Sequence, residues 1–116
     1  MLLNYNGRKH LETYLPSVVL HSQDSAVYLI DNASTDDSLS YVSTEFPQVK
    51  IIQLDKNHGF ADGYNKGLKH IEADYYVLLN TDVEVTKNWL TPVVEYLDMN
   101  ADVVACQPKI LSYKEK

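Results

Sequence analysis

Short apolar runs alternate with longer amphipathic segments along the whole chain, and this alternation constrains the fold more than any other feature of the sequence. It is typical of β/α units that build a parallel sheet. The run AVYLID at 26–31 predicts a buried strand, and further strands are expected at 2–5, 49–54, 75–79 and 103–112. Helices are expected at 8–21, in the segment that Pro47 ends, and at 61–71 and 88–99. The sequence therefore predicts an α/β fold.

Size and charge narrow the class of protein. A chain of 116 residues suits one small domain or part of a larger one, and 1–116 is interpreted as a single partial domain. The net charge of −6 argues against nucleic acid as a partner, because nucleic acid selects a basic face. An acidic protein can still bind an anionic nucleotide when a divalent cation lies between them.

The cysteine content, the lack of a membrane-spanning stretch and the chain ends narrow the class of protein further. The one cysteine, Cys106, lies in an apolar run and is expected to be a buried core residue. No stretch approaches the length of a membrane span and the first residues lack an export signal, so a cytoplasmic location is expected. The first expected strand begins almost at residue 1 and the last runs nearly to Lys116, which indicates a piece of a larger fold.

Polar residues rich in asparagine and aspartate follow each of the first four expected strands. Ligands of open parallel α/β sheets bind beyond the carboxyl ends of the strands, so these segments are expected to converge on one crevice. They are Asn4–Gly7, Asp31–Asn32, Asp55–Gly59 and Asn80–Asp82. A purely structural sheet would not need four polar edges, and the crevice is therefore the candidate binding site.

Asn80-Thr81-Asp82 is the sharpest of these segments, because it directly follows an apolar run. Mg²⁺ and Mn²⁺ prefer oxygen ligands and often take only one or two carboxylates besides substrate phosphates. Asp82 is the candidate metal ligand, and the Asn80 carbonyl oxygen is expected to coordinate or to orient. The alternative is that Asp82 caps the following turn. The histidines show no metal-ligand spacing and are interpreted as surface or loop residues.

Glycines recur at 59, 63 and 67, which lie on one face if the segment is helical. Each glycine weakens a helix by about 1 kcal/mol relative to alanine, so the repetition needs a cause. Close approach of the helix to a ligand is one cause, and tight packing of the helix on the sheet is the other. The spacing is not that of a dinucleotide-binding fingerprint.

Two further segments suit a nucleoside. Asp31 and Asn32 can accept hydrogen bonds from a pyrimidine N3–H or a ribose hydroxyl, and their alternative role is to cap the next helix. Tyr5 at a strand end can stack on a base, and its alternative role is packing in the core.

The order of these segments resembles family 2 of the inverting glycosyltransferases, and within it the branch of bacterial rhamnosyltransferase-like enzymes. The resemblance covers essentially the whole chain. It implies the GT-A nucleotide-diphospho-sugar transferase fold, with three α/β/α layers around a mostly parallel sheet, of which this chain would be the donor-binding part. The matching stretches are LNYNG (Leu3–Gly7), YLIDNASTDDS (Tyr28–Ser38), NHGFADGYNKG (Asn57–Gly67), ADYYVLLNTDVEV (Ala73–Val85), WLTPVV (Trp89–Val94) and VVACQPKI (Val103–Ile110).

The resemblance also implies roles for individual residues. The base pocket would be lined by Tyr5 and Asn6, and the base or ribose would be contacted by Asp31 and Asn32. The residues that border the nucleotide and the donor sugar would be Asn57, Gly59, Gly63 and Asn65. The metal, Mg²⁺ or Mn²⁺, would be held on the diphosphate by Asn80 and Asp82.

Three positions depart from the family pattern, because many relatives have Asp, Arg and Asp where this chain has Asn32, Tyr64 and Asn80. The first departure leaves the identity of the base undetermined. The second removes a positively charged side chain that would contact the diphosphate, and the third removes one negative charge that would face the metal. These departures motivate the alternative of a non-catalytic or degenerate nucleotide-binding or interaction module. A nucleotidyltransferase on the same fold is a further, weaker alternative. Such enzymes have a glycine-rich first loop, and Asn6–Lys9 is a poor substitute for it.

The implied activity is transfer of a sugar from a UDP, dTDP or GDP donor to the hydroxyl of a saccharide or lipid-linked acceptor, with inversion, in the synthesis of cell-surface polysaccharides or glycoconjugates. A general base would deprotonate the acceptor. No position matches the family's base, so none is named and the fragment is expected to be inactive alone. Peripheral contact of the full-length enzyme with the inner face of the membrane and self-association through an exposed sheet edge are further expectations.

Overall fold

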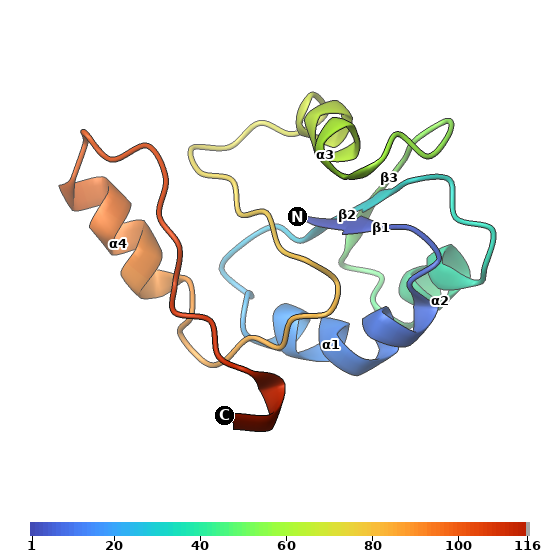
Figure 1. Cartoon of the computed structure of the whole chain (residues 1–116), viewed down its shortest axis with the longest axis horizontal. Coiled ribbons are helices and arrows are strands. Elements are labelled where there is room, and N and C mark those ends of the chain that lie inside the picture. The colour runs from blue at the N-terminus through green and yellow to red at the C-terminus, as the bar shows by residue number, and fades with distance from the viewer. Residues whose placement is uncertain (116) are drawn as a thin grey trace.

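The structure of the protein is a computed structural model that describes residues 1–115 (Figure 1). Its strands are β1 (Leu2–Asn4), β2 (Tyr28–Asp31) and β3 (Lys50–Gln53). Its α-helices are α1 (Arg8–Leu20), α2 (Ser38–Glu45), α3 (Phe60–Leu68) and α4 (Thr91–Met99), and a 3₁₀-helix spans Tyr113–Glu115. The element order confirms the predicted β/α alternation as far as α3, with boundaries shifted by a few residues.

The three strands are parallel and lie in the order β1-β2-β3. After β3 the chain returns to the other side of β1, where Leu79 forms a single parallel bridge with Leu2. Helices α1 and α2 pack together on one face of the sheet and α3 covers the other face, as Figure 1 shows. The structure thus has the predicted three layers, and the direction of winding reverses beside β1.

The core lies between the sheet and α1. Leu11, Leu15 and Val18 recur at helical spacing and are buried against Leu2 and Leu29 of the sheet, as predicted. Pro16 is inside α1 but exposed, so water can reach the carbonyl that loses its helical hydrogen bond. The helix therefore tolerates the proline.

The strand predicted at Tyr75–Leu79 was wrong, because only Leu79 enters the bridge. The Leu79 N–H donates to the Met1 carbonyl at 3.0 Å, and the Met1 ammonium donates to the Val77 carbonyl at 2.7 Å. Among the described residues, the segment before Leu79 makes no ladder with β1. A strand needs a ladder partner along its length, which apolar character alone does not provide.

The strand predicted at Val103–Ser112 was also wrong. The segment has no regular structure and stays outside the sheet, with Val104 99% exposed, and Cys106 is exposed instead of buried. No neighbouring strand offers it hydrogen bonds in the part of the chain that the structure describes. The predicted helix at 88–99 exists as α4 from Thr91, but none of the residues within α4 is fully buried.

The glycine face of α3 is explained by packing against the sheet. A Cβ built on Gly67 would lie 2.2 Å from Cδ1 and 2.6 Å from Cγ1 of Ile30, a fully buried side chain. A Cβ on Gly63 would lie 2.9 Å from Asn32 Nδ2 and 3.0 Å from Leu3 Cδ1. Of the two causes considered for this face, the geometry supports tight helix–sheet packing at both positions.

We therefore expect Gly67→Ala to lower the free energy of unfolding by about 1–2 kcal/mol. Overpacking a core costs about 1–3 kcal/mol, and the better helix propensity of alanine recovers about 1 kcal/mol. Urea unfolding measures the change. In an Ile30→Val background, which removes the clashing Cδ1, the loss should shrink, and an equal loss in both backgrounds would contradict the packing explanation.

Candidate functional site

The candidate site lies where the direction of winding reverses, beside β1. In open parallel α/β sheets the ligand crevice forms at this point, beyond the carboxyl ends of the strands. A cleft of about 430 Å³ is present there. Each of the four polar segments that follow the strands contributes to its lining, together with Leu3, His10 and Phe60. The lining residues are Leu3, Tyr5, His10, Asn32, Asn57, Gly59, Phe60, Asn80, Thr81 and Asp82.

Six of the ten predicted site residues line this cleft. They are Tyr5, Asn32, Asn57, Gly59, Asn80 and Asp82. The other four, Asn6, Asp31, Gly63 and Asn65, are not among its lining residues. The polar segments therefore converge as predicted, but four of the predicted side chains do not line the cleft.

Asp82 lies in the cleft and is exposed, beside Asn80 and Thr81. Among residues 1–115, Asp82 is the one acidic residue that lines the cleft. No three His, Cys, Asp or Glu side chains in this range converge to hold a metal ion by themselves. The donor set fits a hard cation that takes one carboxylate from the protein and its other oxygens from phosphates and water.

Tyr64 holds the segment that carries these residues. Tyr64 belongs to α3 and is buried. Its hydroxyl donates to the carbonyl of Leu79, the residue directly before Asn80, at 2.9 Å. Burial raises the pKa of the Tyr64 hydroxyl, which keeps it protonated as a donor. At the position where the family resemblance expects a charged arginine, this chain therefore has an anchor for the Asn80–Asp82 turn.

Asp31 is 1% exposed and its carboxylate is occupied by protein donors. Oδ1 accepts from Asn4 Nδ2 at 3.0 Å and from the Ser34 hydroxyl at 2.7 Å, while Oδ2 accepts from the Ser34 N–H at 2.9 Å. The side chain thus joins the end of β1 to the loop after β2.

Asn6 fixes the same loop from the other side. Its Oδ1 accepts from the Thr35 N–H at 2.7 Å and from the Asp36 N–H at 3.2 Å, and its own N–H donates to the Ser34 hydroxyl at 2.9 Å. Asn6 has a φ of 50°, a conformation that asparagine tolerates better than most residues. It therefore shapes the rim next to Tyr5, whose ring is 50% exposed and open to stacking.

Asn32 is almost fully buried and binds the loop before α3 at two points. Its Nδ2 donates to the Gly59 carbonyl at 2.9 Å, and its Oδ1 accepts from the His58 N–H at 3.1 Å. Asn57 Oδ1 in turn accepts from the Gly59 N–H at 2.9 Å. Gly59 has φ 78° and ψ −169°, a conformation essentially restricted to glycine. These contacts define one wall of the cleft.

Two predicted residues on α3 do not reach the cleft. Gly63 is buried against the sheet, as described above. Asn65 is exposed and absent from the cleft lining. Sequence reasoning in turn missed Leu3, His10, Phe60 and Thr81, which do line it. His10 is exposed, as its interpretation as a surface residue predicts, and it also lines the cleft because the first turn of α1 starts beside the rim.

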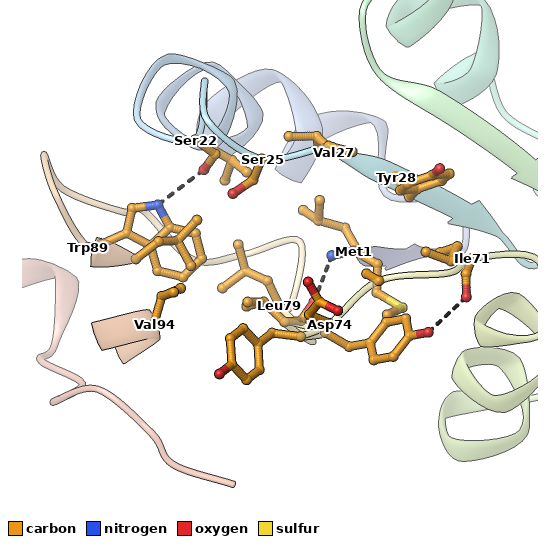
Figure 2. Close-up of a pocket in the computed structure, with 18 of the residues that line it drawn as sticks. Met1, Ser22, Ser25, Val27, Tyr28, Ile71, Asp74, Leu79, Trp89 and Val94 are labelled. Atoms are coloured by element: carbon orange, nitrogen blue, oxygen red, sulfur yellow. Dashed lines mark hydrogen bonds between the residues drawn. The ribbon is translucent and has the colours of Figure 1, made fainter. Parts of the chain in front are cut away.

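A second cavity, of about 300 Å³, lies at the opposite end of the strands (Figure 2). Its lining is mainly apolar and includes Met1, Leu79 and Trp89, whose indole N–H donates to the Ser22 hydroxyl at 3.1 Å. Burial lowers the pKa of the Met1 ammonium to about 6. Because this cavity is remote from the polar rim, it is not the candidate site.

The comparisons with known proteins identify a family and a fold for the chain. Residues 2–115 match the family model described as glycosyl transferase family 2. Polypeptide N-acetylgalactosaminyltransferase 5 of Rattus norvegicus is 31% identical over 84 residues, which cover 69% of this chain and 9% of the rat protein.

Two solved structures have a similar fold. S. aureus TarS 1-349 in complex with UDP-GlcNAc has a TM-score of 0.75 at 24% identity, over 86% of this chain and 30% of that one. The mannosyltransferase PcManGT of Pyrobaculum calidifontis, in complex with GDP-Man and Mn²⁺, has a TM-score of 0.73 at 22% identity, over 83% and 30%. The chain thus spans less than a third of the length of each relative described here. In the part of the chain that the structure describes, no helix is long and apolar enough to cross a membrane.

Proposed function

The chain belongs to glycosyl transferase family 2 and has the GT-A fold, and from this premise we propose that its cleft binds the nucleoside diphosphate of a sugar donor. The observation that carries the proposal is the meeting of Tyr5, Asn57 and Asp82 in one cleft at the carboxyl ends of the strands. An aromatic ring for a base, amides for hydroxyls and a carboxylate for a cation are the groups that such a donor needs.

Asp82 and Asn80 would hold a divalent cation, Mg²⁺ or Mn²⁺, against the diphosphate. When bound, the cation neutralises charge on the departing nucleoside diphosphate. The neighbour PcManGT was solved with GDP-Man and Mn²⁺ and the neighbour TarS with UDP-GlcNAc, which supports both parts of the proposal. With a single protein carboxylate in the cleft, we expect the metal to bind much better with nucleotide than alone.

The finer proposal is transfer with inversion to an acceptor hydroxyl, in polysaccharide or glycoconjugate synthesis, by a rhamnosyltransferase-like enzyme. The acceptor would need a general base, and among residues 1–115 no second acidic residue lines the cleft. Asp98 on α4, an acid beyond the candidate metal position, accepts a hydrogen bond from the Tyr75 hydroxyl. We therefore propose that the described residues supply donor binding and that the base comes from elsewhere.

The lack of a second acidic residue in the cleft lining among residues 1–115 also favours a second candidate, a nucleotide-binding module without catalysis. The two candidates differ in turnover. Hydrolysis or transfer of a UDP-, dTDP- or GDP-sugar by the whole protein would support the enzyme, whereas binding without any consumption of the donor would support the module.

Calorimetry with UDP, dTDP and GDP tests the shared part of both candidates. We expect one of the three to bind in the presence of Mn²⁺, and its affinity to fall at least about tenfold when the metal is removed with a chelator, because the diphosphate then faces Asp82 without a bridging charge. A protein that binds none of the three with Mn²⁺ present would contradict the proposal.

A further inference from the structure

The loop between β3 and α3 contains a nearly buried histidine between two exposed carboxylates. The side chain of His58 is 8% exposed, while those of Asp55 and Asp62 are 79% and 59% exposed. His58 Nε2 lies 2.6 Å from Asp55 Oδ1, and Nδ1 lies 3.4 Å from Asp62 Oδ2. Asp55 comes from the start of the loop and Asp62 from the first turn of α3, so the imidazole ties the two ends of the loop together.

The backbone of the same residue is tied to the sheet. The His58 N–H donates to Asn32 Oδ1, and the next carbonyl, of Gly59, accepts from Asn32 Nδ2. Asn57, Gly59 and Phe60 line the cleft, but His58 does not. His58 therefore lies behind the wall of the cleft, with its ring directed to the loop ends and its backbone directed to Asn32.

We propose that His58 is a positioning residue that holds the 57–60 wall of the cleft in the shape that binds the nucleotide; the role in binding rests on the proposed function. It is not a metal site, because its carboxylate partners lie on different ring nitrogens and no three such side chains within residues 1–115 converge on an ion. An imidazolium has an N–H on each nitrogen and binds both carboxylates, whereas a neutral ring donates to only one.

The charges around the ring suit its contacts with the two ends of the loop. The carboxylates that face it are Asp55 from the loop and Asp62 from α3, and Asn32, directly after β2, is neutral. The hydrogen bond from His58, and then its charge and that of Lys56, hold the pKa of Asp55 below its ordinary value. Asp55 therefore stays ionised over the range near neutral pH where histidines titrate.

Two variants test the proposal in the whole protein. His58→Phe keeps a large side chain but loses both contacts, and His58→Gln keeps a single donor. We expect amide hydrogen exchange at residues 57–60 to rise about tenfold in His58→Phe and less in His58→Gln, while exchange in β1 and β2 stays unchanged. His70→Gln, at an exposed histidine just beyond α3, is the matched control and should behave as the parent.

The functional readout is the affinity, with Mn²⁺ present, for whichever of UDP, dTDP and GDP the parent binds. We expect about a tenfold loss in His58→Phe and a smaller loss in His58→Gln, which keeps one donor for the carboxylates. Unchanged exchange at 57–60, or an unchanged affinity in His58→Phe, would overturn the proposal. If the parent binds none of UDP, dTDP and GDP, the proposed function fails, and the exchange measurement still decides whether His58 fixes the loop.

Discussion

Replacing Asp82 with alanine will remove the Mn²⁺-dependent part of nucleotide binding, with an expected loss of at least about 100-fold in affinity. The expectation follows from the cleft, where Asp82 is the one acidic residue among those described. Loss of a group that only supports a metal ligand typically costs 10–100-fold, and a ligand itself should cost at least about that much. The residual affinity should equal that of the parent measured with a chelator.

The fold should not depend on Asp82, because its side chain is exposed and the Asn80–Asp82 turn is held by Tyr64 through Leu79. The thermal midpoint of Asp82→Ala should therefore stay close to that of the parent. Asp24→Ala, at an exposed aspartate outside the cleft lining, is the matched control and should bind as the parent does. Retained metal dependence in Asp82→Ala would contradict the assignment of residue 82.

How far the sequence predicts this site depends on what each signal measures. Polar residues in the segments that follow apolar runs, such as Asn80 and Asn57, line the cleft as predicted, because parallel strands bring their carboxyl ends to one edge. The direction of each side chain was not available from position alone. Asp31 and Asn32 are neighbours in sequence, yet Asn32 lines the cleft and Asp31 is enclosed by Asn4 and Ser34.

The same limit applies to the glycines and to two of the expected strands. Spacing placed Gly63 and Gly67 on one face of α3, but only the packing against Leu3 and Ile30 shows that this face meets the sheet. Apolar composition predicted strands at 75–79 and 103–112, and neither forms a ladder. Strand formation requires a partner that lies far away in sequence, whereas helix periodicity is local, which is why all four helices were predicted.

Asp31→Ala will lower the free energy of unfolding by about 3 kcal/mol, because it leaves buried donors without their acceptor. The Ser34 N–H and hydroxyl and the Asn4 amide all donate to this carboxylate in the parent. Urea unfolding measures the loss. Asp37→Ala is the matched control in the same loop, since Asp37 is exposed and makes no side-chain cap, and it should change stability by no more than about 0.5 kcal/mol.

The comparison of Asp31→Ala with Asp31→Asn separates two roles for this residue. If Asp31 chiefly joins β1 to the loop after β2, both variants lose stability, and asparagine loses less because its carbonyl oxygen can still accept from Ser34. If Asp31 instead chiefly contacts the base, both variants keep the parent's unfolding energy and lose affinity for nucleotide in the folded state. The buried position and the three donors favour the first outcome, in which Asp31 acts on the cleft through the loop that it fixes beside Asn6.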